Sequence, residues 1–188
     1  MSGAVNRAIF CDRDGVLNRA VVRNGKPYPP TSLEELDIPE SNPHLLRMAR
    51  EQGFLLIGVT NQPDVARGTQ SRAVVEAINA KILTILPLTE VLVCYHDDRD
   101  QCDCRKPKPG LLLAAAAKYG VDLSASFMIG DRWRDVEAGR RAGCRTVWIN
   151  YNYDEHWHGD APDQTVHCLA EAIEWIISRT EFIPLETD

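Results

Sequence analysis

Five short apolar runs, separated by stretches with helical periodicity, constrain the fold of this chain more than any other feature. Each run is rich in strand-forming residues and lacks a clean alternation of polar and apolar positions; the runs are 8–11, 54–59, 91–94, 127–129 and 146–149. Strands that are buried on both faces of a parallel sheet have this pattern. The runs therefore predict an α/β fold, a Rossmann-like three-layer sandwich with a central parallel sheet.

The stretches between and after these runs have the pattern of helices, and they cover 43–52, 72–86, 109–119, 135–142 and 169–178. Gly53, Gly120 and Gly143 follow three of them, as glycine often does where a helix ends. Ser71 precedes a fourth and is a candidate N-cap. Regular alternation of strands and helices predicts helices on both faces of the sheet.

The length of the chain, 188 residues, predicts a single domain over 1–188 and leaves no room for a large cap domain. Two segments interrupt the strand–helix rhythm. Residues 18–40 carry four prolines, which predict a loop or small flap, and 151–164 is a second irregular stretch. Residues 180–188 are expected to form a frayed tail.

Charge and hydropathy exclude several classes of partner. The formal net charge of −6 argues against a nucleic-acid partner, whose phosphates require a basic face. No apolar run approaches the roughly 20 residues that span a bilayer, and the first seven residues lack the apolar core of a signal peptide. We expect a cytoplasmic, monomeric protein that binds neither nucleic acid nor membrane.

Polar residues that can bind a metal ion or take part in catalysis follow the predicted strands or precede a predicted helix. The segments are Asp12-Arg13-Asp14-Gly15, Thr60-Asn61-Gln62, Arg105-Lys106-Pro107 and Gly130-Asp131-Arg132-Trp133-Arg134-Asp135. Each segment alone is weak, because aspartate and glycine are common in turns and a lone lysine is commonly a solvated charge. The carboxyl ends of parallel strands share one edge of a sheet, so we expect these segments to meet there.

The chemistry of such a cluster is specific. Crowded carboxylates repel one another unless a cation lies among them, and oxygen ligands suit Mg²⁺. A lysine and a threonine hydroxyl, here Lys106 and Thr60, can orient phosphoryl oxygens beside that cation. One carboxylate can then attack phosphorus, while another, two residues along, protonates the leaving oxygen and activates water.

These segments resemble, in order, the four motifs of the haloacid dehalogenase superfamily of phosphatases, over roughly residues 8–150. The resemblance implies a Mg²⁺-dependent phosphatase that acts through an aspartyl-phosphate intermediate. It implies that Asp12 is the nucleophile, that Asp14 is the general acid and base, and that Lys106 bridges phosphate and nucleophile. Thr60 and Asn61 are implied to contact the phosphate.

The same resemblance implies the ligands of the magnesium ion. Asp12, the Asp14 backbone carbonyl and Asp131 are implied to hold the ion, and Asp135 to support it directly or through water. An aspartate at position 12 favours phosphate chemistry, and the presence of Asp14 favours hydrolysis over dehalogenation.

A second cluster of ligand-type residues lies in the loop 94–104. Cys94, His96, Cys102 and Cys104 supply three thiolates and an imidazole, which form a closed structural zinc set. The alternative is free cysteines with incidental spacing. A zinc ion would stiffen this loop, which runs directly into the Arg105-Lys106 segment.

The zinc loop resembles that of the branch containing the D-glycero-D-manno-heptose-1,7-bisphosphate phosphatases and the histidinol-phosphate phosphatases. The resemblance implies a small phosphorylated metabolite as substrate, foremost D-glycero-D-manno-heptose 1,7-bisphosphate cleaved at its C7 phosphate. The five-residue spacer inside the zinc loop is closer to the histidinol-phosphate enzymes, and Pro63-Asp64-Val65 departs from the small residues expected of the heptose enzymes.

The sequence leaves two interpretations for the residues that would select the substrate. Arg67 and Arg105 are candidates for binding a second phosphate, and the alternative for each is a surface charge. A third reading of the whole chain is a non-catalytic, zinc-stabilised binding module. The intact set of aspartates, threonine and lysine argues against that third reading.

Overall fold

A central sheet of six parallel strands organises the protein, whose computed structural model describes residues 5–180. The strand order is β5-β4-β1-β6-β7-β8. The strands are β1 (Arg7–Cys11), β4 (Phe54–Asn61), β5 (Glu90–Cys94), β6 (Phe127–Gly130), β7 (Arg145–Ile149) and β8 (Gln164–Val166). The predicted tail at 180–188 lies outside the described residues except for Thr180, which ends the last helix.

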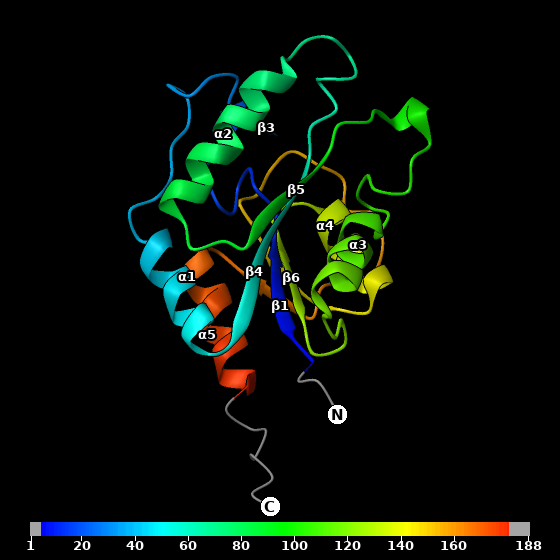
Figure 1. Cartoon of the computed structure of the whole chain (residues 1–188). Helices are drawn as coiled ribbons and strands as arrows, with labels where there is room; N and C mark the ends of the chain where they lie inside the picture. Colours follow the sequence, from blue (N-terminus) through cyan, green and yellow to red (C-terminus); the bar gives the residue numbers. More distant parts are fainter. Residues whose placement is uncertain (1–4, 181–188) are drawn as a thin grey trace, which may run out of the picture.

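Helices cover both faces of the sheet (Figure 1). One layer contains α1 (Asn42–Glu51), α2 (Arg72–Ile85) and α5 (Leu169–Thr180), and the other contains α3 (Gly110–Tyr119) and α4 (Trp133–Ala142). The predicted three-layer α/β sandwich is therefore confirmed. No helix among the described residues is long and apolar enough to cross a membrane.

Strand β1 explains why the apolar runs lack alternation. Its side chains point alternately to the two faces, so Ile9 and Cys11 join the core beneath one helix layer while Ala8 and Phe10 join the other. All four side chains are completely buried. Two cores, one on each face, thus require apolar residues at successive positions of the strand.

The helix ends follow the sequence signals, with one difference. Gly120 and Gly143 end α3 and α4 in the left-handed conformation, at φ of 61° and 89°. Glycine adopts this conformation without a Cβ clash, which is why it ends helices so often. Ser71 does precede α2, but its side chain makes no capping hydrogen bond there.

Two regions predicted to lack strands contain short ones. Residues 18–40 include an antiparallel hairpin of β2 (Val21–Arg23) and β3 (Lys26–Tyr28), and β8 adds a sixth strand at the sheet edge. Asn24 and Gly25 turn the hairpin with positive φ values of 51° and 73°, as a two-residue turn requires. Pro27 fits because this pair lies outside the main sheet.

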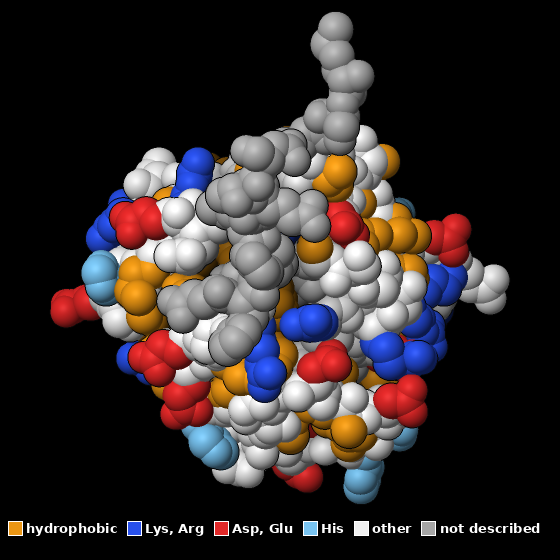
Figure 2. Space-filling view, turned by 90° about the horizontal axis from the view of Figure 1, so that it is seen from below, with side chains coloured by type: hydrophobic (Ala, Val, Ile, Leu, Met, Phe, Trp, Pro, Cys, Tyr) orange, Lys and Arg blue, Asp and Glu red, His pale blue; other side chains and the backbone are white. Residues whose placement is uncertain are grey.

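The topology creates a crevice at one end of the sheet. The chain passes from β1 to β4 on one side and later from β5 to β6 on the other, so β1 lies between β4 and β6. Ligands of open α/β sheets bind at this kind of switch point, outside the carboxyl ends of the strands. Figure 2 looks onto the opposite end of the molecule, where acidic and basic side chains are interspersed.

Candidate active site

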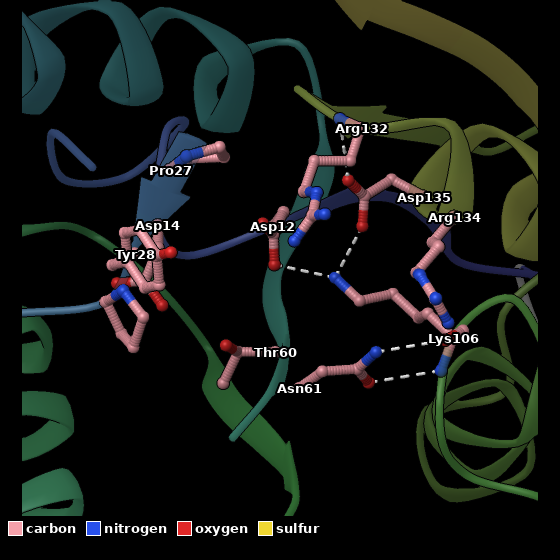
Figure 3. A pocket seen from close by; sticks show the side chains of 11 residues that line it. Asp12, Asp14, Pro27, Tyr28, Thr60, Asn61, Lys106, Arg132, Arg134 and Asp135 are labelled. Carbon is pink, nitrogen blue, oxygen red and sulfur yellow. Dashed lines mark hydrogen bonds and ion pairs between the residues drawn. The ribbon is translucent and has the colours of Figure 1, made fainter. Parts of the chain in front are cut away.

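Asp12 and Lys106 form a buried ion pair at the centre of the crevice (Figure 3). Asp12 directly follows β1, and its backbone N–H donates to Ile129 of β6. The Lys106 ammonium lies 2.6 Å from the carboxylates of both Asp12 and Asp135, and it donates to the Val59 carbonyl at 2.7 Å. The end of β1, strand β4, helix α4 and the loop before α3 therefore meet at one ammonium group.

Burial is the largest influence on the pKa values of Asp12, Asp131 and Lys106. It raises the pKa of Asp12 to about 7, although Lys106 works in the opposite direction. Burial also raises the pKa of Asp131 well above its usual range, and the negative charge of Asp12 adds to the shift. Burial disfavours the charged form of Lys106, but the carboxylates of Asp12 and Asp135 overcome it and raise the lysine pKa. The site thus concentrates negative charge that one lysine offsets only in part.

The donor set of the acidic cluster fits a hard cation. Asp12, Asp131 and Asp135 each offer a carboxylate oxygen, and these oxygens lie within 4.8 Å of one another. Both Asp131 oxygens are buried and make no direct hydrogen bond of ordinary geometry among the described residues, although the nearby Tyr153 hydroxyl partly offsets the effect of burial on the Asp131 pKa. Gly15 lies against this carboxylate so closely that an added Cβ would fall 1.9 Å from Oδ2. Buried, unpartnered carboxylate oxygens are costly without a counter-charge, and Mg²⁺ prefers such ligands.

Thr60 and Asn61, at the end of β4, also border the crevice. The Thr60 hydroxyl is buried and accepts a hydrogen bond from Gln62 at 2.9 Å. The Asn61 amide donates to the Lys106 carbonyl at 3.0 Å and accepts from its N–H at 3.1 Å. These two hydrogen bonds to the backbone fix the segment that carries the buried lysine. The predicted contact of Asn61 with phosphate stays a prediction.

The Asp14 carboxylate borders the crevice but is held by a different group of residues. Arg13, itself completely buried, donates to both Asp14 oxygens at 3.0 Å and to Asn79 of α2 at 2.8 Å. Asn18 and Gln62 donate to the same carboxylate at 3.1 and 2.8 Å. Motif spacing identified neither Arg13 nor Gln62 as important. The signal for Arg13 was its charge beside two aspartates at a buried strand end.

These residues surround a small cavity of about 80 Å³ at the end of the sheet, which we call the inner pocket. Its walls also include Pro27 and Tyr28 of the hairpin, so the predicted flap does contribute to the site. All four predicted catalytic side chains, Asp12, Asp14, Thr60 and Lys106, line it. Asp131 lies beside Gly15 at the acidic cluster.

A wider cavity of about 560 Å³, the outer pocket, adjoins the inner one and shares Tyr28 and Asn61 with it. Arg67 and Arg105 line the outer pocket, but both already bind carboxylates, and their predicted role in binding a second phosphate stays a prediction. Arg67 donates twice to Asp97, and the Arg105 guanidinium donates to Asp98 at 2.8 Å.

Two arginines that the sequence analysis did not single out border both pockets. Arg132 and Arg134, at the start of α4, reach towards the inner pocket from one side in Figure 3. Arg134 lies 3.7 Å from Asp98 and over the Trp133 ring, and Arg132 pairs with Glu155. Both positions lie within the Gly130–Asp135 motif, between the two aspartates that define it.

The thiolate cluster lies beside the outer pocket. Ligand atoms of Cys94, His96, Cys102 and Cys104 approach one another at between 3.2 and 3.7 Å. A tetrahedral zinc ion bound at about 2.3 Å to sulfur and about 2.0 Å to nitrogen separates its ligands by roughly 3.5–3.8 Å. The four predicted residues thus have the donor atoms and nearly the spacing of a structural zinc site, with His96 presenting Nδ1.

Comparisons with known proteins agree with this geometry. The HAD-hydrolase-like family model matches residues 103–172. A D-glycero-beta-D-manno-heptose-1,7-bisphosphate 7-phosphatase of Pseudomonas aeruginosa is 36% identical, over 75% of this chain and 79% of the relative. A D-glycero-D-manno-heptose-1,7-bisphosphate 7-phosphatase of Chlorobaculum tepidum is 32% identical, over 89% of this chain and 92% of the relative.

A solved structure extends the likeness to the whole fold. The D,D-heptose 1,7-bisphosphate phosphatase from B. bronchiseptica, complexed with magnesium and phosphate, superposes with a TM-score of 0.74. That match has 24% sequence identity and covers 92% of this chain and 99% of the other. The resemblance inferred from four short motifs is therefore confirmed. This chain belongs to the haloacid dehalogenase-like family of phosphatases, which hydrolyse phosphoric monoesters.

Proposed function

We propose that this protein hydrolyses the C7 phosphate of D-glycero-D-manno-heptose 1,7-bisphosphate through an aspartyl-phosphate on Asp12. The observation that carries the chemistry is the position of Asp12, between the Lys106 ammonium at 2.6 Å and the unpartnered Asp131 carboxylate. The names of relatives that are 31–36% identical support the substrate. The outer pocket is large enough to hold more than the transferred group.

The proposed magnesium site uses Asp12, Asp131 and Asp135, together with the Asp14 backbone carbonyl. The first three form the acidic cluster, and the orphaned Asp131 oxygens are the feature that a cation explains. When bound, Mg²⁺ would neutralise the cluster and the phosphate, so that one anion can approach another. The Asp14 side chain takes no part in this set, because Arg13, Asn18 and Gln62 engage its oxygens.

In the first half-reaction the Asp12 carboxylate attacks phosphorus, and the bond from phosphorus to the sugar oxygen breaks. Lys106 and the Thr60 hydroxyl, both buried at the inner pocket, bind the phosphoryl oxygens during transfer. Protonated Asp14 supplies the proton that the leaving sugar oxygen requires. Asn61 contributes by fixing the backbone of Lys106.

In the second half-reaction water attacks the phosphoryl group on Asp12, and Asp14, now a carboxylate, accepts the proton of that water. Inorganic phosphate leaves and Asp12 is regenerated. The four hydrogen bonds from Arg13, Asn18 and Gln62 hold the Asp14 carboxyl group in place beside the inner pocket.

We propose that the second phosphate of the substrate lies in the outer pocket. Arg105, which is only 11% exposed, and Arg67 remain the candidates that the sequence suggested. The positions of Arg132 and Arg134 at the boundary of the two pockets add two further guanidinium groups. Guanidinium groups suit phosphate because they donate two parallel hydrogen bonds.

The thiolate cluster is proposed to hold a structural zinc ion in the loop 94–104. Zinc there would stiffen the segment that leads into Arg105 and Lys106. Reduced thiols of this kind also support a cytoplasmic location, because oxidising compartments favour disulfides. We propose further that residues 1–188 form one monomeric phosphatase domain with its flap at 18–40.

A phosphate-release panel tests the proposal with zinc-loaded protein and added Mg²⁺. We expect the heptose bisphosphate to give the highest kcat/KM, and heptose 7-phosphate a lower one. Histidinol phosphate is the second candidate, favoured by the five-residue zinc-loop spacer and by the acidic side chains of the outer pocket. A higher kcat/KM for histidinol phosphate would reject the heptose substrate, and no release from any phosphate ester would support the binding module.

A further inference from the structure

Arg132, at the boundary of the two pockets, already forms an ion pair with a carboxylate of the protein. The Arg132 guanidinium donates through Nε to Glu155 at 2.9 Å and through a second nitrogen to the other Glu155 oxygen. The two side chains keep 39% and 21% of their surface exposed, so the pair is partly accessible to water. A carboxylate bound along one edge of a guanidinium, through Nε and one terminal nitrogen, occupies a pair of donors that a phosphate could otherwise use.

Glu155 is presented by a segment that is tied down on both sides. The 150–163 segment follows β7. Its Trp157 ring packs on Trp148 of β7 with ring centroids 4.6 Å apart, and its His158 ring packs on Trp133 at the start of α4 with centroids 5.1 Å apart. On the other side, the Asp154 N–H donates at 3.0 Å to the carbonyl of the β2–β3 turn. Glu155 lies between these anchors, so its reach to Arg132 is built into the fold.

The charges of the outer pocket are nearly balanced. Five cationic side chains line it, and four carboxylates, Glu155 among them, line it as well. An incoming anionic group therefore meets guanidinium groups that already have partners. It must displace a carboxylate before it can bind one of them in full, and this competition lowers its apparent affinity.

We propose that Glu155 is a specificity-determining residue that acts as an internal competitor for the second anionic group of the substrate. Its carboxylate occupies Arg132 until a substrate anion in the outer pocket displaces it. The inference rests on the proposed function for the identity of that anion, but the competition itself requires only a ligand with two anionic groups. Ligands with one anionic end bind at the inner pocket and place no anion in the outer pocket, so we expect them to compete little with Glu155 for Arg132.

The test compares ligands with one and two anionic ends in wild-type protein and in Glu155→Gln, both zinc-loaded and with Mg²⁺. Turnover of an aryl phosphate is inhibited with propane-1,3-bisphosphonate or with propylphosphonate, which requires no knowledge of the substrate. Asp160→Asn is the matched control, because Asp160 is a carboxylate of the same segment that pairs with Arg140 at 3.3 Å, away from the outer pocket. A second arm measures kcat and KM for the heptose bisphosphate.

We expect Glu155→Gln to tighten inhibition by the bisphosphonate about fivefold and to change inhibition by the monophosphonate little, since a partly exposed ion pair has a modest strength. KM for the bisphosphate should fall by a similar factor, with kcat little changed. Glu155→Asp keeps the charge but shortens the side chain, so it should tighten bisphosphonate inhibition by less. Asp160→Asn should match wild type in every assay.

Equal changes for both phosphonates, or no change for the bisphosphonate, would overturn the proposal. Weaker bisphosphonate inhibition in folded Glu155→Gln would overturn it too, because it would mean that Glu155 holds Arg132 in place for the ligand. In a further outcome, wild type fails to hydrolyse the heptose bisphosphate while Glu155→Gln still tightens inhibition by the bisphosphonate more than inhibition by the monophosphonate. That result would reject the proposed substrate and support the competitor role of Glu155.

Discussion

The two ligand clusters of this protein differ in nearly every physical respect, although they lie at neighbouring sites. The acidic cluster offers buried oxygen atoms from two chain segments far apart in sequence, next to a buried lysine. The thiolate cluster offers sulfur and nitrogen atoms from a single loop of eleven residues, and His96 in it is exposed. The first has an adjoining cavity, while the second closes on itself.

The difference teaches what each cluster can do. Oxygen ligands beside an open cavity suit a hard cation that shares its coordination with phosphate. Four soft or borderline ligands leave no open position, which suits a structural ion. Removing the first cluster should therefore abolish catalysis with little effect on folding, and removing the second should destabilise the fold. The following predictions test that division, from the largest expected effect to the smallest.

Asp12→Asn should lower phosphate release by at least roughly 10³-fold, because the amide cannot form the covalent intermediate. The variant should remain folded, since the substitution is close in shape. Steady-state phosphate release and a thermal melt measure the two properties. Activity near wild type in verified variant protein would reject the covalent mechanism.

Cys104→Ser should lower the free energy of unfolding by about 2–5 kcal/mol, because a structural zinc ion contributes its binding energy to folding. Chelation of zinc from wild type should have a similar effect. The measurement is the melting temperature together with the zinc content, and Cys168→Ser, outside the cluster, is the control. An unchanged melting temperature in zinc-free protein would show that the loop needs no metal.

Asn61→Ala should lower kcat about 10- to 100-fold with a smaller effect on KM, because the Lys106 backbone loses both of its hydrogen bonds to the Asn61 side-chain amide. Asn6→Ala is a control, since Asn6 also bonds to backbone but at the Tyr119 carbonyl, away from the site. Steady-state kinetics distinguishes the outcomes. A rise in KM alone would instead support direct binding of phosphate by Asn61.

The stability of zinc-loaded but magnesium-free protein should fall as pH rises from about 4 to about 7. The folded-state pKa of Asp12 is raised to about 7 by burial, so in this window the folded state binds more protons than the unfolded state, whose aspartate pKa is about 3.9. Melting temperatures across that range measure the slope. Asp12→Asn should flatten it, and an equal slope in that variant would contradict the assignment to Asp12.

The candidate catalytic residues could be predicted from the sequence because the sheet fixes the register of the strands that carry them. Asp12, Thr60 and Asp131 each lie at the carboxyl end of a parallel strand, and β1 pairs with both neighbours. Once the runs were read as strands, the meeting of these side chains followed from geometry. The four candidate zinc ligands could be predicted equally well, because they lie close together along the chain.

Other features depend on contacts between distant segments, which a pattern in one segment does not reveal. Arg132 is paired with Glu155, which lies 23 residues further along the chain, and Arg13 donates a hydrogen bond to Asn79 of α2. The hairpin of residues 21–28 was missed for a different reason. Its prolines outweighed the Asn24-Gly25 turn signal, which is strong in isolation.

The most direct test of the account is chemical trapping of the intermediate. Zinc-loaded protein turning over a phosphate ester with Mg²⁺ is quenched in acid, and the acyl phosphate is reduced with borohydride before peptide mass spectrometry. Reduction of an aspartyl-phosphate converts that aspartate to homoserine, so the account predicts homoserine at position 12 and none in Asp12→Asn. Modification at another aspartate, or none during active turnover, would contradict it.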